Sequence, residues 1–327
     1  MTAAPDRRLG ELLARYQGEG PGAALAVIRN GAAEQHVSGY ASLEAREAIT
    51  ASTNFRLASI TKQFTAAAIL LLSETGKLTV DDRVHAWLPT LPGAAQPVTI
   101  RHLLTHSSGL IDYEDVIPAS MTAQLHDADV LTLLETQNRT YFAPGTGYRY
   151  SNSGYALLAL IVEKASGETF ASYLRGHIFK PLGMHSTVAH EEGISTVSNR
   201  AFGYSEVNGS WQRTDQSQTS AVLGDGGIYS SLNDLAQWDA ALYDERLLKT
   251  SSLQAAFAPS TRTDDASVQY GFGWRITGET LWHSGETIGF RNVIVRYPQR
   301  RMTIILLTNR DDPEPYPTAL AIAKLYL

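Results

Sequence analysis

The chain has 327 residues, of which 43% are hydrophobic and 18% charged, a composition typical of a globular protein with an ample core. Its net charge of −6 is dispersed and includes no basic stripe, which argues against nucleic acid as a partner. The longest apolar runs, residues 66–72 and 304–307, are far shorter than the roughly 20 residues of a membrane helix. We therefore expect a soluble protein without a membrane span.

The absence of cysteine excludes disulfides and thiolate chemistry but does not identify the compartment. The first eight residues, MTAAPDRR, contain no apolar signal-peptide core. The sequence therefore fits a cytoplasmic protein as written, or a periplasmic or secreted protein whose leader has been removed.

The first predicted unit is a helix followed by a β-hairpin. Residues 5–16 place leucine and tyrosine at helical spacing, with Asp6 near the start. Residues 23–29 and 33–40 are strand-like and flank Asn30-Gly31, a dipeptide favoured in two-residue hairpin turns. We expect the helix to cover a sheet that includes this hairpin.

A long helix is predicted over residues 60–75, which contain good helix formers and no proline and are followed by Gly76. Ser59 and Lys62 fall in its first turn. Residues three apart on a helix have Cβ atoms roughly 5 to 6 Å apart, so the lysine can reach the serine hydroxyl and act as a proton acceptor beside a nucleophile. The alternative is a helix-capping serine with a solvated lysine, because Ser-x-x-Lys is common by chance.

Helices and long loops dominate the pattern from here to about residue 265. Predicted helices cover residues 99–110, 155–164, 170–179 and 231–243, the last beginning with Ser-x-x-Asp. A glycine-rich loop, residues 142–149, leads into Tyr150-Ser151-Asn152. This triplet presents a phenol and an amide together, so Tyr150 is a candidate proton shuttle and Asn152 a candidate binder of a substrate amide or carbonyl.

Antiparallel strands are predicted near the C-terminus, at residues 273–277, 280–283, 290–297 and 301–309. Residues 302–307 are apolar on both strand faces, which predicts a central strand covered on each side. The helix at 5–16 and another at about 317–325 can cover one face, and the helical middle the other.

The resulting prediction is an α+β fold in which both chain ends form an antiparallel sheet with an all-helical region inserted. Residues 1–58 and 266–327 form the sheet region and residues 59–265 the helical region. Together they make one catalytic unit with the active site between them.

A third group of candidate residues, His283-Ser284-Gly285-Glu286, lies at a predicted strand edge. The glycine permits close approach of a substrate to the backbone. His283 and Ser284 are candidate hydrogen-bond donors to that substrate, and the N–H of Glu286 is a candidate member of an oxyanion hole.

The three groups resemble, in order, the motifs of the penicillin-recognising serine hydrolases. Ser59 and Lys62 match Ser-x-x-Lys, Tyr150 and Asn152 match Tyr-x-Asn, and residues 283–285 match the third motif, Lys-Thr-Gly or His-x-Gly. The similar branch includes class C β-lactamases, DD-carboxypeptidases, D-aminopeptidases and β-lactamase-like esterases. The resemblance spans about residues 20–310 and includes framework-like segments at 103–110, 181–184 and 226–230.

This resemblance implies a β-lactamase/transpeptidase-like fold and an acyl-enzyme mechanism. Ser59 would attack a carbonyl, Lys62 and Tyr150 would handle protons within one hydrogen-bonded cluster, and the backbone N–H groups of Ser59 and Glu286 would hold the oxyanion. Which of Lys62 and Tyr150 is the dominant base stays open.

His283 departs from the drug-hydrolysing members, which carry lysine there, because imidazole is mostly neutral near pH 7. The resemblance therefore favours a DD-peptidase, a D-aminopeptidase or amidase, or a carboxylesterase over an efficient β-lactamase. The alternative is a penicillin-binding or sensing module that is acylated without efficient turnover. The expected partner is a small-molecule or short-peptide substrate, and the oligomeric state is not predicted.

We expect no cofactor and no metal. His102 and His106 are four residues apart, but no third ligand is evident. Tyr148 is the aromatic residue nearest a motif and is therefore expected to line the substrate cleft. Asp225, in Gly224-Asp225-Gly226-Gly227, receives no role.

Overall fold

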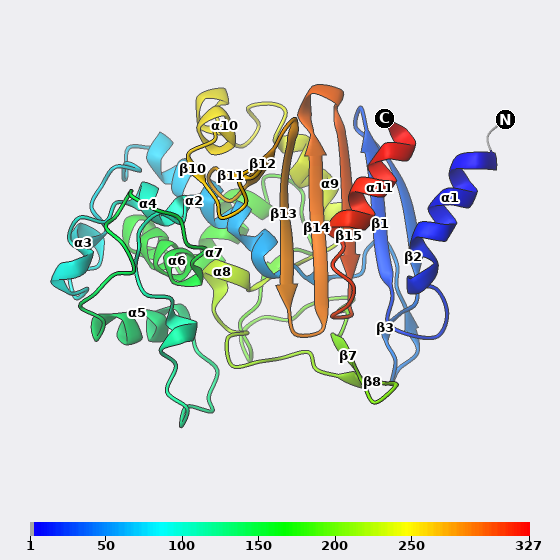
Figure 1. Cartoon of the computed structure of the whole chain (residues 1–327), viewed down its shortest axis with the longest axis horizontal. Helices are drawn as coiled ribbons and strands as arrows, with labels where there is room; N and C mark the ends of the chain where they lie inside the picture. The colour runs from blue at the N-terminus through cyan, green and yellow to red at the C-terminus, as the bar shows by residue number, and fades with distance from the viewer. Residues whose placement is uncertain (1–2) are drawn as a thin grey trace.

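The computed structural model describes residues 3–327 and has an eight-stranded antiparallel sheet at its centre. The sheet order is β10-β11-β12-β13-β14-β15-β1-β2. β1 pairs with β15, so that Ala23 lies opposite Thr308 and both chain ends build one sheet, as predicted. The strands are β1 (Ala23–Arg29), β2 (Ala32–Ser38), β10 (Thr261–Arg262), β11 (Gln269–Tyr270), β12 (Arg275–Thr277), β13 (Thr280–Thr287), β14 (Phe290–Tyr297) and β15 (Met302–Thr308) (Figure 1).

Two local predictions about the sheet are confirmed. Asn30 and Gly31 join β1 to β2 with φ values of 50° and 82°, the positive φ that a tight hairpin turn requires. β15 lies between β14 and β1 with all of its residues buried, as its continuous apolar sequence predicts.

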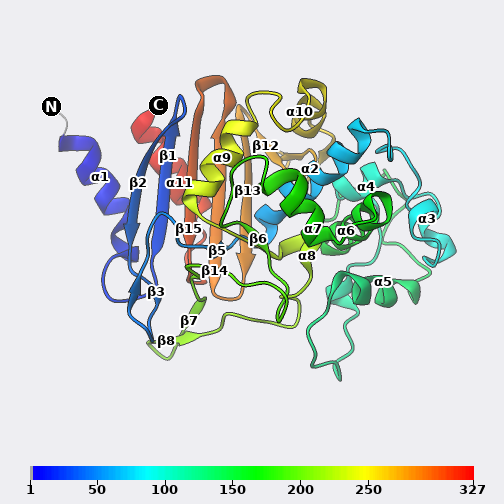
Figure 2. The ribbon, with the colours of Figure 1, turned by 180° about the vertical axis from the view of Figure 1, so that it is seen from behind.

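The sheet is covered by helices on both faces. The terminal helices α1 (Ala3–Leu13) and α11 (Tyr316–Tyr326) share one hydrophobic core with Leu25 and Ile304. Figure 1 shows both helices in front of the sheet. On the opposite face, shown in Figure 2, α9 (Leu232–Ala241) packs across β1 and β15, and Ala24 and Ile305 join the larger core. The predicted layer arrangement is thus confirmed.

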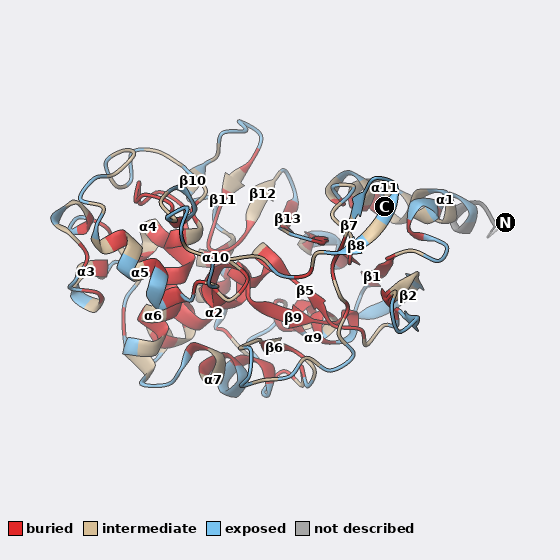
Figure 3. Cartoon of the chain, turned by 90° about the horizontal axis from the view of Figure 1, so that it is seen from below, coloured by how far each residue is buried: buried red, intermediate tan, exposed pale blue. Residues whose placement is uncertain are grey.

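The helical region is built around two buried helices, α2 and α6, seen in red in Figure 3. Across residues 3–327, no helix combines the length and apolar character needed to cross a bilayer. The helices of this region are α2 (Thr61–Glu74), α3 (Val84–Trp87), α4 (Ile100–Leu104), α5 (Asp127–Glu135), α6 (Asn152–Ser166), α7 (Phe170–Leu174), α8 (Leu223–Gly226) and α10 (Thr250–Phe257). The short strands are β3 (Tyr40–Ser42), β4 (Glu47–Ala48), β5 (Phe55–Arg56), β6 (Val188–Ala189), β7 (Tyr204–Val207), β8 (Ser210–Arg213) and β9 (Ile228–Ser230).

The helix predicted at residues 99–110 is shorter than expected, because α4 ends at Leu104. His106 and Gly109 adopt left-handed backbone conformations, with φ values of 56° and 69°. The segment then pairs with the glycine-rich loop, whose Arg149 N–H donates to the His106 carbonyl at 3.0 Å. This pairing brings Tyr150 to the site. The proposed division at residues 58/59 and 265/266 stays a prediction.

Candidate active site

Ser59 lies in a 3-10 turn, Ala58–Ile60, between β5 and α2, and not in the first turn of the helix itself. β5 is held in place by pairing with β9, where Phe55 lies opposite Ser230. Ala58 has a φ of 49°, an unfavourable conformation for a residue with a side chain, and such strain is often found at functional sites. Ser59 is only partly buried, so its hydroxyl is accessible from the adjacent pocket.

Lys62 joins the first two motifs. Its side chain is fully buried, with 0% exposed. Nζ donates to Ser59 Oγ at 3.1 Å, to Asn152 Oδ1 at 2.8 Å and to the backbone carbonyl of Asp225 at 3.0 Å. These contacts use all three ammonium donors, so the group is fixed beside the serine.

Asn152 is the first residue of α6, and Asp112 holds it there. Asp112 Oδ2 accepts from the Asn152 N–H at 2.7 Å, a contact favoured at a helix N-terminus. The Asn152 side chain accepts from Lys62 and donates through Nδ2 to Glu114 Oε1 at 3.0 Å. The Tyr-x-Asn motif therefore depends on the acidic segment Asp112–Asp115, which sequence reasoning did not select.

Tyr150 contacts Lys62 through its ring. Nζ of Lys62 lies 4.8 Å from the Tyr150 ring centroid, within cation–π range. The His106 ring packs on the Tyr150 ring, with their centroids 4.3 Å apart. The phenol oxygen of Tyr150 is buried and has no hydrogen-bond partner in the described part of the chain. Lys62 thus contacts Tyr150 only through the phenol ring, while its hydrogen bonds run to Ser59, Asn152 and the Asp225 carbonyl.

His283 is 1% exposed, and both ring nitrogens are hydrogen-bonded within the protein. Nδ1 lies 2.6 Å from the Ser284 carbonyl, which can only accept, so Nδ1 carries the proton. Nε2 then accepts from the Tyr270 hydroxyl at 2.8 Å. Burial lowers the pKa of His283 well below its ordinary value. The structure therefore holds a neutral imidazole between the Ser284 carbonyl and the Tyr270 hydroxyl, and the ring does not line the pocket.

Gly285 is required by the chain's own packing. A Cβ at this position would lie 2.0 Å from the Leu57 carbonyl oxygen, because β13 packs closely against the turn that carries Ser59. On the other edge, β12 pairs with β13 only as far as Trp282. A substrate was expected to approach this glycine, whereas the contact found is with the Leu57 carbonyl, two residues before Ser59.

Replacing Gly285 with Ala is expected to displace the Ser59 turn or the strand. Overpacking of a filled site costs typically about 1 to 3 kcal/mol, so we expect a lower Tm and a reduced kcat. Calorimetry and ester hydrolysis would measure both. Gly176→Ala is a control for loss of glycine alone, since a Cβ there would meet open space and its φ is not positive. An unchanged kcat and Tm in Gly285→Ala would contradict the packing argument.

Ser59 opens onto a small polar pocket of about 50 Å³. It is bounded by β5, the Ser59 turn, the loop after Ile111, the start of α6, α8 and the end of β13. The lining residues are Arg56, Ala58, Ser59, Tyr113, Glu114, Asn152, Thr219, Asp225, Gly226, Glu286 and Thr287. Ser284 is half-buried on β13 next to this pocket without lining it. Tyr148 instead lines a separate cavity of about 430 Å³.

Two carboxyl groups in this pocket have raised pKa values. Burial raises the pKa of Asp225 to about 8, and the Tyr113 hydroxyl donates to its Oδ2 at 3.0 Å. Burial and the neighbouring Asp112 raise the pKa of Glu114. Sequence reasoning missed both acids. The only available signals were the acidic run after Gly109 and the unexplained Asp225, neither of which indicates a shared pocket.

The two histidines considered as metal ligands have other contacts. His106 Nδ1 accepts from the Ser151 N–H at 3.0 Å, and His102 Nδ1 accepts from the Thr99 N–H at 3.2 Å. Between residues 3 and 327, no group of three or more His, Cys, Asp or Glu side chains is arranged to hold a metal ion.

The chain is similar over most of its length to a known protein family and to two characterised bacterial proteins. The sequence profile of the family described as Beta-lactamase matches residues 6–326. The chain is 34% identical over 311 residues to penicillin-binding protein 4* of Bacillus subtilis, covering 89% of this chain and 68% of that protein. It is 30% identical over 319 residues to a D-aminopeptidase of Gluconobacter oxydans, covering 94% of this chain and 59% of the relative.

Among solved structures, the octameric penicillin-binding protein homologue from Pyrococcus abyssi superposes with a TM-score of 0.87 at 27% identity. The alignment covers 100% of this chain and 78% of that one. The predicted fold class is therefore confirmed. Because the D-aminopeptidase is considerably longer than this chain, part of that relative has no counterpart here.

Proposed function

The chain belongs to the beta-lactamase family of serine hydrolases, and from that premise we propose that it hydrolyses amides and esters that carry a free ammonium group near the scissile carbonyl. The D-aminopeptidase name of one relative supports this substrate class. The observation that carries the proposal is Glu114, a carboxylate that lines the catalytic pocket and is hydrogen-bonded to the motif residue Asn152.

We propose that Lys62 acts as the base toward Ser59. Asn152 Oδ1 and the Asp225 carbonyl can only accept, so the direction of their bonds with Nζ is fixed. The bond to Ser59 is the one that can reverse, since a hydroxyl can donate to a neutral amine. A neutral Lys62 would then take the hydroxyl proton as Oγ attacks the carbonyl carbon.

The remaining steps follow from the same geometry. The oxyanion would accept hydrogen bonds from the N–H groups of Ser59 and Glu286, the former at the start of a helix where N–H groups lack intrahelical partners. The protonated Lys62 returns its proton to the leaving nitrogen as the C–N bond breaks. Water then attacks the acyl-enzyme and gives a proton to Lys62. As the bond between the acyl carbon and Ser59 Oγ breaks, Lys62 returns that proton to Oγ and the acid is released. We assign Tyr150 an electrostatic contribution through its ring, and His283 the positioning of the Ser284 backbone.

Glu114 supplies the specificity in this proposal. Its Oε1 accepts from Asn152, which orients the carboxylate at the pocket wall. The three hydrogen-bond partners of Lys62 Nζ are Ser59, Asn152 and the Asp225 carbonyl, so Glu114 is left available to a substrate cation. An ammonium on the substrate would therefore compensate a partly desolvated carboxylate.

Replacing Glu114 with Gln is expected to lower kcat/KM for a D-alanyl amide by about 10- to 150-fold relative to a neutral acetyl ester, because a charge-assisted hydrogen bond is lost. In wild type the amide-to-ester ratio should fall as pH decreases through the raised pKa of Glu114, since only the ionised form attracts ammonium. Steady-state kinetics across pH would measure the amide-to-ester ratio of kcat/KM in wild type and in Glu114→Gln.

The exposed Glu206→Gln is the matched control and should change neither ratio. Equal losses on amide and ester in Glu114→Gln would assign Glu114 to the support of Asn152 alone. Acylation of Ser59 without steady-state release of product would instead favour the penicillin-binding or sensing module.

A further inference from the structure

Arg56 is a buried guanidinium at the wall of the catalytic pocket. Its side chain is 3% exposed. It lines the same pocket as Ser59, which follows it three residues later in the sequence. Nη2 donates to the Ser220 carbonyl at 2.7 Å. Nε and Nη1 are buried and have no hydrogen-bond partner among the residues that the structure describes.

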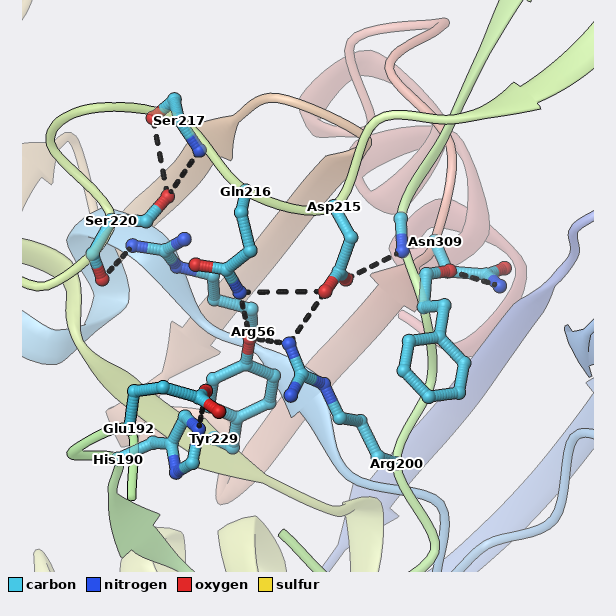
Figure 4. A network of polar contacts seen from close by, with 12 residues as sticks. Arg56, His190, Glu192, Arg200, Asp215, Gln216, Ser217, Ser220, Tyr229 and Asn309 are labelled. Atoms are coloured by element: carbon cyan, nitrogen blue, oxygen red, sulfur yellow. Dashed lines mark hydrogen bonds and ion pairs between the residues drawn. The ribbon is translucent and has the colours of Figure 1, made fainter. Parts of the chain in front are cut away.

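Two other arginines of low exposure have carboxylate partners. Arg296 Nε lies 2.6 Å from Asp239 Oδ1, and Arg200 Nη2 lies 2.5 Å from Asp215 Oδ2. Figure 4 shows Arg200 bound to Asp215 and Tyr229, while Arg56 reaches only Ser220. Over residues 3–327, Arg56 forms no ion pair. A guanidinium cannot lose its proton, and a buried charge without a partner is costly, so this site favours an incoming anion.

We propose that Arg56 is a binding subsite for a carboxylate group on the substrate. This inference rests on the proposed function and extends it from ammonium-bearing amides to substrates that carry both an ammonium and a carboxylate. Thr219 and Thr287 line the pocket together with Arg56, and their hydroxyls can add neutral donors. A planar guanidinium binds a carboxylate with two parallel hydrogen bonds, from Nη2 together with Nε or Nη1. Either unused nitrogen of Arg56 can therefore act with Nη2, which now donates to the Ser220 carbonyl.

Access to these nitrogens requires a small movement. The Ser220 carbonyl belongs to a turn at residues 217–220, closed by a hydrogen bond of 2.8 Å from the Ser217 N–H to Ser220 Oγ. Displacement of this turn would admit the carboxylate beside, or in place of, the Ser220 carbonyl. Glu114 and Arg56 line one small pocket, so the ammonium and the carboxylate of the proposed substrate must lie close together. An unblocked dipeptide and an acidic amino acid amide both meet this requirement.

The carboxylate can lie on the leaving residue or on the side chain of the acyl residue, and two substrate pairs distinguish these cases. D-alanyl-glycine against D-alanyl-glycinamide tests a carboxylate on the leaving residue. D-glutamic acid α-amide against D-glutamine α-amide tests a carboxylate on the acyl side chain. In wild type, at least one pair should favour the acid in kcat/KM by about 10- to 150-fold, the range for a charge-assisted hydrogen bond.

Arg56→Gln should bring that acid-to-neutral ratio close to one, whatever its effect on the absolute rate, and Arg56→Lys should retain part of it. The exposed Arg262→Gln should keep the wild-type ratio. Arg275→Gln is the second comparison, because Arg275 is a guanidinium 5.5 Å from the Tyr150 ring centroid and its loss should leave the ratio intact if Arg56 is the anchor.

A wild-type measurement covers the case in which Arg56→Gln does not fold. Sodium acetate should raise KM for the favoured acid more than for its neutral partner, and acetamide should not. Ratios near one in wild type, an acid preference that persists in folded Arg56→Gln, or indifference to acetate would overturn the proposal. Hydrolysis of the neutral amides with flat ratios would overturn this subsite alone, whereas no hydrolysis of any amide would overturn the proposed function.

Discussion

Ser59→Ala is expected to lower kcat by about five to six orders of magnitude, as removal of a serine nucleophile does in other hydrolases. The hydroxyl of Ser59 is the one that contacts Lys62 and opens onto the pocket. Alanine deletes the attacking atom and leaves Lys62 with two of its three acceptors. The fold should persist, because Ser59 is only partly buried and its turn is held by β5 and β9.

Intact-mass spectrometry after a fluorophosphonate tests the assignment directly. Wild type should gain one adduct on the peptide that contains Ser59, and Ser59→Ala should gain none. Ser251→Ala, an exposed serine on α10, is the control and should react like wild type. A persistent adduct in Ser59→Ala would place the nucleophile elsewhere.

The sequence was sufficient for the features that depend on local pattern. Residues 302–307 are apolar on both faces, which predicted the central strand, and Asn30-Gly31 predicted the hairpin turn. Ser-x-x-Lys followed by a helical run predicted the contact between Ser59 and Lys62, although the 3-10 turn before α2, and not α2 itself, carries the serine.

Features that depend on tertiary approach could not be predicted in the same way. Glu114 and Asp225 are separated by more than 100 residues in sequence, and only the packing of α8 and the segment after Ile111 brings them to one pocket. The same limit applies to Gly285, because the group that leaves no room for a side chain there is the Leu57 carbonyl, in a segment distant in the sequence. His283 looks like a pocket donor in the motif, yet its ring turns toward Tyr270 inside the sheet region.

Arg56 shows how burial changes the meaning of a charged residue. In sequence it is an unremarkable polar residue at the edge of a short strand. In the structure Arg56 is nearly fully buried, has a single carbonyl partner and lines the pocket that Ser59 opens onto. Glu114 lines the same pocket, so groups of both charge signs border it, and the proposed substrates carry both.

Lys62→Met should slow acylation by at least about two orders of magnitude, the usual scale for loss of a general base. Methionine fills similar space without a charge, but it leaves Asn152 Oδ1 and the Asp225 carbonyl without their donor. Each unpaired buried acceptor costs about 1 to 3 kcal/mol, so a lower Tm should accompany the loss of rate.

Lys62→Arg separates the two roles that the geometry allows this residue. Arginine keeps the positive charge but cannot accept a proton, so it should be as slow as methionine if Lys62 is the base. The rate of fluorophosphonate inactivation and the burst rate with an aryl ester measure acylation in each variant, after the Tm has shown that it is folded. Recovery of the rate in Lys62→Arg would assign Lys62 to electrostatic stabilisation and return the base to Tyr150. In that case Tyr150→Phe should lose the same two orders, because the phenol would then have to turn from its unpartnered position toward Ser59.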